Sequence, residues 1–197
     1  MRIIAGRFKG QTIYTPKNAA TTRPTTDRAK EAIFSHLEAT GVLEGARVVD
    51  IYAGTGALGF EALSRGASSV VFVEAQPHIA QLIAKTAQNL HGADVSALSV
   101  RVVRSKAEKF TERMAQRDMV QRSTRDAFDL VFFDPPYAVS TDAVNEQIRQ
   151  ISTVMSPEGI IMVERSIRSE DIEAPDAWQI YLKKDYGETT VFYLEQA

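Results

Sequence analysis

Short apolar runs alternate with helical segments along this chain of 197 residues, and that alternation restricts the fold more than any other feature. Five runs are typical of buried strands: "ARVVDIYAG", "SVVFVEA", "LSVRVV", "FDLVFFD" and "GIIMVER". Strands that are separated by helices predict a mostly parallel sheet with helices on both faces. The last apolar segment, "WQIYLKKDYGETTVFYLE", predicts an antiparallel hairpin that closes the sheet at the C-terminus.

Apolar residues at helical spacing predict helices between these strands, over residues 25–37, 57–66, 77–92, 107–121 and 142–155. The first helix has an apolar face formed by Ala29, Ala32, Ile33 and Leu37. The segment "RIIAGRFKGQTIYT" alternates like a hairpin, with Gly6 and Gly10 near possible turns. We therefore expect one α/β domain, with a core over residues 25–197 and a basic N-terminal β-hairpin over residues 1–24.

Composition excludes several kinds of chemistry. The chain contains no cysteine, which excludes disulfides, zinc–thiolate sites, iron–sulfur clusters and a thiol nucleophile. His36, His78 and His91 show no ligand spacing, so we expect no metal site. No apolar run is long enough to span a bilayer, and the first residues lack the apolar core of a signal peptide. We expect a cytoplasmic protein that acts as a monomer and does not bind membranes.

The net charge of −2 conceals an uneven distribution of charge. Residues 1–30 contain seven Arg or Lys residues and one acid, which leaves about −8 for the rest of the chain. A basic segment on an acidic protein indicates binding to a polyanion such as nucleic acid. The alternative is a solvated basic tail.

A glycine-rich segment, "DIYAGTGALG", follows the first core strand and precedes its helix. In a parallel α/β sheet, ligands bind at the carboxyl ends of the strands, where glycines let the backbone approach a ligand closely. Gly54, Gly56 and Gly59 match a dinucleotide fingerprint, and Glu74 lies twenty residues after Gly54, where a ribose-binding acid is expected. The spacing alone leaves two cofactors open, a nicotinamide dinucleotide and S-adenosylmethionine.

Asp50, at the tip of the first core strand, favours S-adenosylmethionine. A carboxylate there repels an anionic pyrophosphate, whereas it stabilises the ammonium and the sulfonium of a methionine group. Structural alternatives remain open, with Asp50 as a helix cap, Glu74 as a solvated strand end and the glycines as a plain tight turn.

The fourth core strand ends in "DPPY", residues Asp134, Pro135, Pro136 and Tyr137. Two consecutive prolines remove two backbone donors and stiffen the turn, which fixes the directions of their carbonyl groups. A carboxylate, a fixed carbonyl and an aromatic ring together suit a planar group that carries N–H donors. The alternative is a rigid strand exit without chemistry.

The glycine loop, the acid that ends the second strand and the DPPY segment together resemble a Rossmann-like, class I methyltransferase that uses S-adenosylmethionine. The DPPY form resembles the amino-methyltransferases, which methylate exocyclic nitrogens of adenine or guanine. Three further segments, "MRIIAGRFKG", "TRPTTDRAKEAIF" and "YGETTVFYL", resemble the bacterial guanine-N2 methyltransferases of 16S ribosomal RNA, the RsmD-like family. The match spans nearly the whole chain.

The resemblance implies that the substrate is a guanine of 16S rRNA, in a partly or fully assembled small ribosomal subunit. It also implies a set of residues that contact the cofactor: Asp50, Ala53, Gly54, Gly56, Leu58, Glu74, Ala75, Ser105, Lys106, Ala107 and Asp134. Lys106 departs from the family pattern, in which Asp or Asn often accepts a hydrogen bond from the adenine amine, because an ammonium group cannot accept one. We expect Ser105 or a backbone carbonyl to serve instead.

The DPPY segment supplies the expected catalytic residues, Asp134, Pro135 and Tyr137. An exocyclic amine shares its lone pair with the ring and is a poor nucleophile. We expect the Asp134 carboxylate and the Pro135 carbonyl to accept its two N–H bonds, and Asp134 to stabilise the developing cation and take the released proton. Tyr137 is expected to stack on the base. The absence of cysteine agrees, since methylation of a pyrimidine carbon usually needs a thiolate.

The basic N-terminal segment is expected to bind RNA phosphates around a splayed-out base. The candidate RNA-binding residues are Arg2, Arg7, Lys9, Arg23, Thr25 and Arg28. For Arg28, an ion pair with Asp27 or Glu31 on the helix surface is the alternative.

Three other functions stay open on the sequence alone. An adenine-N6 methyltransferase acting on DNA or RNA would grip its amine in the same way. An oxidoreductase would use NAD through the glycine fingerprint. A non-enzymatic RNA-binding protein would need the basic segment and not Asp134.

Overall fold

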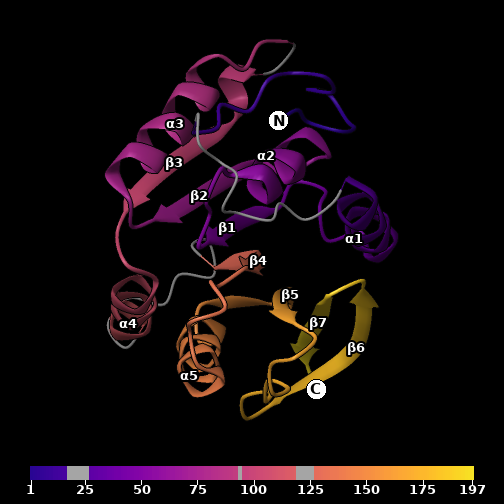
Figure 1. The fold of residues 1–197 in the computed structure, drawn as a ribbon, viewed down its shortest axis with the longest axis vertical. Helices are drawn as coiled ribbons and strands as arrows, with labels where there is room; N and C mark the ends of the chain where they lie inside the picture. Colours follow the sequence, from indigo (N-terminus) through magenta and orange to yellow (C-terminus); the bar gives the residue numbers. More distant parts are fainter. Residues whose placement is uncertain (17–26, 93–94, 119–126) are drawn as a thin grey trace.

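A seven-stranded sheet forms the centre of the protein in a computed structural model that describes residues 1–16, 27–92, 95–118 and 127–197 (Figure 1). The strands are β1 (Arg47–Ile51), β2 (Ser69–Glu74), β3 (Ser99–Arg104), β4 (Phe128–Phe133), β5 (Met155–Ser166), β6 (Trp178–Tyr186) and β7 (Thr189–Gln196). The helices are α1 (Asp27–Thr40), α2 (Ala57–Ser64), α3 (Pro77–Gln88), the short 3₁₀ helix η2 (Val95–Ala97), α4 (Ala107–Asp118) and α5 (Thr141–Ser152). Each strand predicted for the sheet and each predicted helix is thus found, whereas the predicted N-terminal hairpin has no regular strand.

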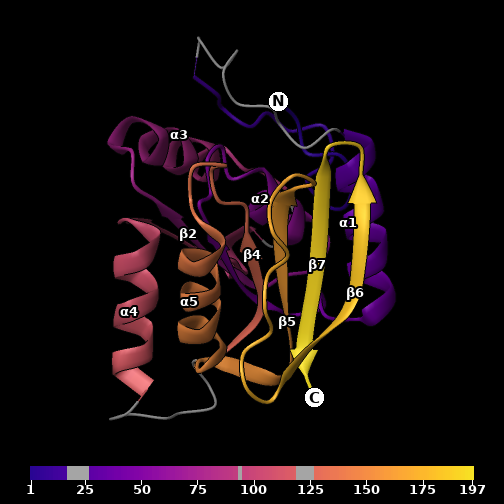
Figure 2. The same cartoon turned by 60° about the horizontal axis from the view of Figure 1, so that its bottom comes forward.

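The strand order is β3-β2-β1-β4-β5-β7-β6. Strands β1 to β5 pair in parallel, whereas β7 is antiparallel to both β5 and β6. The predicted mostly parallel sheet with a closing C-terminal hairpin is therefore confirmed, and Figure 2 shows that hairpin beside β5. The order reverses between β1 and β4, and the carboxyl ends of strands at such a switch point are where α/β proteins bind ligands.

Helices cover both faces of the sheet, as the sequence predicts (Figure 1). On one face, α1, α2 and α3 contribute to an apolar cluster, here called the first core, with alternate strand residues such as Val48, Phe72 and Phe132. On the other face, α4 and α5 pack on the intervening strand residues, such as Val49 and Val131, to form the second core. The alternation along each strand thus decides which face a side chain joins.

Several helix boundaries differ from the prediction. The helix expected over residues 142–155 begins at Thr141, where the Ser140 hydroxyl accepts a hydrogen bond from the Ala143 N–H, and it ends at Ser152. Met155 already pairs with Phe128 of β4, so β5 begins before "GIIMVER", the apolar run that predicted this strand. Helix α3 ends at Gln88, four residues before the glycine expected to stop it. Helix α1 ends at Thr40, directly before Gly41, where a glycine is expected to end it.

Residues 1–16, here called the N-terminal arm, lie over α2 and are part of the main core. Ile3, Phe8 and Ile13 are fully buried in the first core. The expected β-hairpin is only an irregular reversal in the described residues, with a single antiparallel bridge between Arg2 and Thr12. Because the arm covers its outer side, α2 is buried from Leu58 to Ser64, which explains why this helix is apolar all round.

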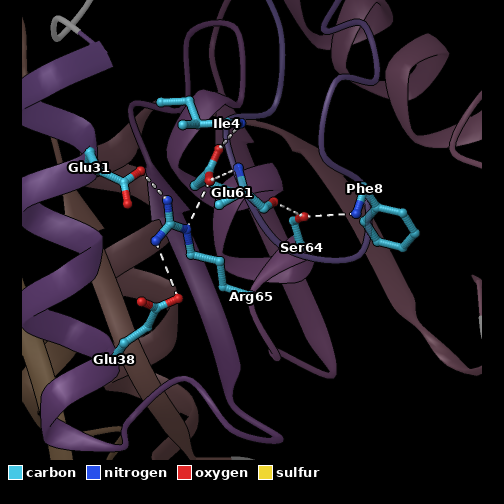
Figure 3. Close-up of polar contacts among 8 residues, drawn as sticks. Ile4, Phe8, Glu31, Glu38, Glu61, Ser64 and Arg65 are labelled. Carbon is cyan, nitrogen blue, oxygen red and sulfur yellow. Dashed lines mark hydrogen bonds and ion pairs between the residues drawn. The ribbon is translucent and has the colours of Figure 1, made fainter.

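Glu61 fastens the arm to α2 (Figure 3). Its fully buried carboxylate accepts hydrogen bonds from the backbone N–H groups of Ile4, at 2.8 Å, and Ala5, at 2.9 Å. It also pairs with Arg65, whose Nε lies 2.9 Å away. The Arg65 guanidinium then reaches Glu31 and Glu38 of α1, at 2.7 and 3.2 Å, so one cluster connects the arm, α2 and α1.

Ser64 provides a second attachment (Figure 3). Its hydroxyl donates to the Ala5 carbonyl and accepts from the Phe8 N–H at 2.9 Å. Gly6 passes so close that a Cβ at this position would lie 2.0 Å from the Ser64 carbonyl oxygen, and its φ of +76° also favours glycine. The close approach therefore requires glycine at this turn of the arm.

Replacement of Glu61 by Ala should destabilise the protein, because Arg65 and two backbone donors then lose a buried acceptor. We expect the free energy of unfolding to fall by about 3–5 kcal/mol, the usual cost of breaking a buried ion pair from one side. Glu38→Ala, which removes a half-exposed partner of the same arginine, is the matched control and should cost less than about 1 kcal/mol. Urea denaturation measures both, and equal effects would contradict this account.

Candidate active site at the carboxyl ends of the strands

Four acids end four neighbouring parallel strands on one face of the sheet. Asp50, Glu74 and Glu164 lie near the ends of β1, β2 and β5, and Asp134 follows β4 directly. Each acid stands two residues after a strand residue of the first core: Val48, Phe72, Met162 and Phe132 respectively. Because side chains alternate along a strand, all four carboxylates point to the side of α1 and α2.

Asp50 lies beneath the glycine loop and is almost fully buried. Its carboxylate accepts a hydrogen bond of 3.0 Å from the N–H of Gly59, in the first turns of α2. Burial raises the pKa of Asp50 to about 8, and the nearby Glu74 adds to this rise, while the Gly59 N–H opposes it. The sequence alternative of a helix-capping role thus has support, and without a ligand the Asp50 carboxyl group is mostly protonated at neutral pH.

Glu74 holds the other side of the loop. One carboxylate oxygen accepts from the Gly54 N–H at 3.0 Å, and the other accepts from the Gln76 N–H at 2.7 Å. The loop itself turns through left-handed residues, with φ of +65° at Tyr52, +54° at Gly54 and +78° at Gly56. A non-glycine residue in this region is uncommon and is typical of functional sites. Glu74 is therefore fixed at the loop and is not a solvated strand end.

Two glycines of the loop are required by packing. A Cβ on Gly56 would lie 2.9 Å from the Phe60 ring, and one on Gly59 would lie 2.3 Å from the Phe72 ring. These contacts let α2 lie close against β2, which is the role of the last glycine in a dinucleotide fingerprint. The fingerprint spacing therefore explains helix packing here and does not by itself identify the ligand.

Asp134 lies at the switch point beside β1, where its N–H is 3.5 Å from the Ile51 carbonyl oxygen. The residue is exposed, although protein surrounds much of the carboxylate, so water near the group limits the effect of burial. Loss of hydration, followed by repulsion from Glu164 and Asp50, raises the pKa of Asp134 well above its usual range. The group is thus a better proton acceptor than an ordinary aspartate.

The rest of the DPPY segment divides into a buried and an exposed part. Pro135 is buried, whereas the Tyr137 ring is 66% exposed. A turn follows, in which the Val139 N–H donates to the Pro136 carbonyl at 2.9 Å. An exposed ring beside a carboxylate is available to stack on a planar ligand.

A polar cluster on the other face of the sheet connects the glycine loop to the DPPY segment. The Tyr52 hydroxyl donates to Oε1 of Gln147 on α5 at 2.9 Å. The buried Arg165 of β5 donates from Nη2 to the Val139 carbonyl at 3.0 Å. Tyr52 and Arg165 also interact electrostatically, so the two loops are supported by one set of side chains. Gln147 and Arg165 carry no signal in the sequence, because their partners are far away in the chain.

The residues expected near the adenine lie at the start of α4 and after β2. The Ser105 N–H donates to the Glu74 carbonyl at 3.1 Å, which places β3's exit next to that of β2. The Ser105 hydroxyl donates to the Lys106 carbonyl at 3.0 Å. Lys106 and Ala75 are exposed, Ala107 is buried, and the Leu58 side chain lies in the first core, so only its backbone can face a ligand.

The structure describes four of the six candidate RNA-binding residues. Arg2, Arg7, Lys9 and Arg28 are exposed. Arg23 and Thr25 lie outside the residues that the structure describes. Glu31, the possible partner of Arg28, contacts Arg65 instead, while the Asp27 side chain also lies outside the described set.

The acids at the carboxyl ends of the parallel strands suit a cationic ligand. Four carboxylates, one of them tied to the loop backbone, favour a sulfonium and an ammonium and disfavour a pyrophosphate. No cluster of acids and histidines among the described residues could hold a metal ion. A hollow of about 480 Å³ lies elsewhere, at the amino ends of the strands between Thr40, Pro157 and Tyr181, and contains none of the four acids. Within the part of the chain that is described, no helix is long and apolar enough to cross a membrane.

The fold and this site define a Rossmann-like methyltransferase of class I, for which S-adenosylmethionine is the cofactor. The family described as conserved hypothetical protein 95 matches residues 1–195. The ribosomal RNA small subunit methyltransferase D of Escherichia coli is 31% identical over 188 residues, which cover 95% of this chain and 86% of the relative. The chain therefore belongs to the family of these methyltransferases, as the sequence resemblance predicted.

Two further proteins agree with this membership. The protein of the same name from Haemophilus influenzae is 29% identical over 187 residues, covering 95% of this chain and 89% of that one. The solved structure of an Escherichia coli protein provisionally assigned as a methyltransferase has a TM-score of 0.77 and 28% identity, covering 100% of this chain and 97% of that one. The oxidoreductase alternative is thereby set aside.

Glu164 and Lys30 are a buried acid and a buried base that were not among the residues predicted for the site. Both are buried on the face that carries the other three acids, Glu164 on β5 and Lys30 in the first turn of α1. The signal for Glu164 was present, since "GIIMVER" places an acid at the end of an apolar strand, as "VVFVE" does. Nothing in the sequence indicated that Lys30 is buried. The helical spacing places Ala29 and Ile33 on the apolar face, and a lysine next to such a face is ordinarily expected to be exposed.

Asp50→Asn should change how stability depends on pH. Between about pH 4 and pH 8 the folded wild type holds a proton on Asp50 that the unfolded chain releases, so its stability falls as the pH rises. Asparagine does not titrate. We expect the free energy of unfolding of the wild type to fall relative to the variant by up to about 1.4 kcal/mol per pH unit in this window.

Urea denaturation at pH 5, 6, 7 and 8, without ligand, measures the difference. Asp142→Asn, a change at an exposed position on α5, is the control and should not alter the pH profile. Parallel pH profiles of the wild type and the Asp50→Asn variant would contradict the raised pKa of the buried Asp50 carboxyl group.

Proposed function

We propose that the protein transfers a methyl group from S-adenosylmethionine to the exocyclic N2 amine of a guanine in small-subunit ribosomal RNA. The observation that carries the proposal is the position of Asp134: parallel pairing of β1 and β4 holds its carboxylate beside the glycine loop. Two prolines and the contact from Arg165 to Val139 restrain the segment that bears it. The names of the relatives, which are methyltransferases of small-subunit ribosomal RNA, support an RNA substrate.

The loop residues would hold the cofactor, which supplies an electrophilic methyl group on a sulfonium. Glu74, which is held by the Gly54 and Gln76 N–H groups, has lone pairs left for the two ribose hydroxyls. The positive end of the cofactor would lower the pKa of Asp50, and the buried carboxylate that forms would stabilise this end through space. Ser105, Lys106 and Ala107, at the start of α4, border the adenine.

The DPPY segment would orient the guanine amine. The Asp134 carboxylate and the Pro135 carbonyl accept its two N–H bonds, so that the nitrogen lone pair is free to attack. Positive charge develops on the nitrogen as the new bond forms, and the Asp134 carboxylate is placed to stabilise it. The raised pKa of Asp134 then favours transfer of the proton from the methylated amine to this carboxylate. Tyr137, which is exposed, stacks on the base.

The N-terminal arm would bind the RNA backbone. Arg2, Arg7 and Lys9 are exposed on a segment whose apolar residues are anchored in the first core. A basic segment fixed to the core holds its charges in place before RNA arrives, so less ordering entropy is lost on binding. Arg28, at the start of α1, extends the same set.

Asp134→Ala should slow methylation strongly while the protein stays folded. Small subunits from cells that lack the modification are incubated with the enzyme and methyl-labelled S-adenosylmethionine, and the rRNA is digested to nucleosides. We expect label in N2-methylguanosine, and a rate lower by about 10²–10⁴-fold for the variant, the range for loss of a positioned acid–base group. Asp176→Ala, at an exposed position far along the chain, is the control and should match the wild type.

Other outcomes would change the proposal in defined ways. Label in N6-methyladenosine would keep the mechanism and replace guanine by adenine. Label in N2-methylguanosine that is undiminished in Asp134→Ala would keep the substrate and overturn the role of the DPPY segment. No label in any nucleoside, with cofactor binding demonstrated by calorimetry, would favour a non-enzymatic RNA-binding protein.

Arg7→Ala combined with Lys9→Ala should weaken binding to RNA and reduce its dependence on salt. Each phosphate contact that is lost should lower the slope of log K against log[salt] by about 0.7–0.9. Filter binding of small subunits at several salt concentrations measures this slope. Arg113→Ala, an exposed arginine on α4, is the matched control, and an effect as large as that of the double variant would exclude a specific role for the arm.

A further inference from the structure

We propose that Glu164 determines the specificity for guanine by accepting a hydrogen bond from the ring N1–H next to the amine that Asp134 holds. The inference rests on the proposed function and names a second acid in the base site. It concerns a residue that lies outside the glycine loop and the DPPY segment.

The sheet brings the two carboxylates together. Phe133 of β4 pairs with Val163 of β5, so Asp134 and Glu164 are the next pair in the same parallel register. Both continue the alternation of residues that face the first core, Phe132 on β4 and Met162 on β5. Neighbouring strands lie about 4.8 Å apart, which leaves both carboxylates within reach of adjacent atoms on one base edge.

The surroundings of Glu164 are consistent with a ligand-facing carboxylate. Glu164 interacts with Asp134, whose raised pKa shows the effect of a second negative charge nearby. The residue is buried, with 7% of it exposed, and it lies beside β7, where it pairs with Val191 and interacts with Tyr193. A buried carboxylate is costly unless hydrogen-bond donors surround it. It has about four lone-pair positions, so a contact within the protein leaves others for a substrate.

The chemistry of the bases explains the selectivity. Guanine presents N1–H and the N2 amine side by side, so its edge carries only donors at these positions. Adenine presents its amine next to N1, which is an acceptor and would face the Glu164 carboxylate with a lone pair. Sites built to bond a substrate N–H reject analogues that lack it, because the buried polar group of the site is then left unpaired. Two adjacent carboxylates therefore suit guanine and exclude adenine.

The test uses Glu164→Gln and a base analogue. Once the methylated position is mapped, small subunits are reconstituted with guanosine or with 2-aminopurine there. 2-Aminopurine keeps the amine but has an acceptor at N1. We expect the wild type to methylate 2-aminopurine at least tenfold less efficiently in kcat/KM. For Glu164→Gln, whose amide can donate to N1, we expect kcat/KM on guanosine to fall about 10- to 100-fold, the range for one hydrogen bond to a charged group, and the preference for guanosine to shrink at least tenfold.

Glu158→Gln, on the same strand at its amino end, is the matched control and should keep the wild-type preference. An unchanged preference in folded Glu164→Gln, with both substrates slowed equally, would overturn the inference and leave a structural role. Equal kcat/KM of the wild type for both bases would overturn it without any variant, so a variant that fails to fold does not block the test. If the wild type forms no N2-methylguanosine with guanosine in place, the proposed function fails, which is a different result.

Discussion

Parallel pairing of β1, β2, β4 and β5 is the constraint on which the site depends. Because the side chains alternate and the carboxyl ends of parallel strands meet at one edge, acids separated by up to 114 positions, from Asp50 to Glu164, share one face. Crowding of carboxylates raises the free energy of the folded protein. The backbone N–H groups of Gly54, Gln76 and Gly59 offset part of this repulsion, and a cationic ligand would offset more.

The two faces of the sheet have different roles in the site. The acids face the side of α1 and α2, where charge is needed, while Tyr52, Gln147 and Arg165 lie on the side of α5 and hold the loops. Positioning of this kind accounts for a large part of the rate of group-transfer enzymes, because alignment of the reactants removes an entropic cost.

The order of strands and helices could be predicted from the sequence, since each buried strand is a short apolar run and each helix has its own spacing. Asp50, Glu74 and Asp134 could be predicted because each follows such a run directly. The environment of Lys30 and the contacts of Gln147 and Arg165 could not, because they depend on partners far away in the chain. The arm illustrates the same limit: its alternation predicted a hairpin, whereas its apolar residues pack over α2 with one bridge, Arg2 to Thr12.

The burial of α2 between the sheet and the arm has a consequence for how the chain is synthesised. The arm is made first, but its hydrogen bonds to Glu61 and Ser64 span 56 to 59 positions, so Ile3, Phe8 and Ile13 have no place to pack until α2 has left the ribosome. Helix α2 also begins at the glycine loop. The segment that carries the basic residues and the loop beside the acids therefore both depend on α2, and neither can take its final place before this helix is made.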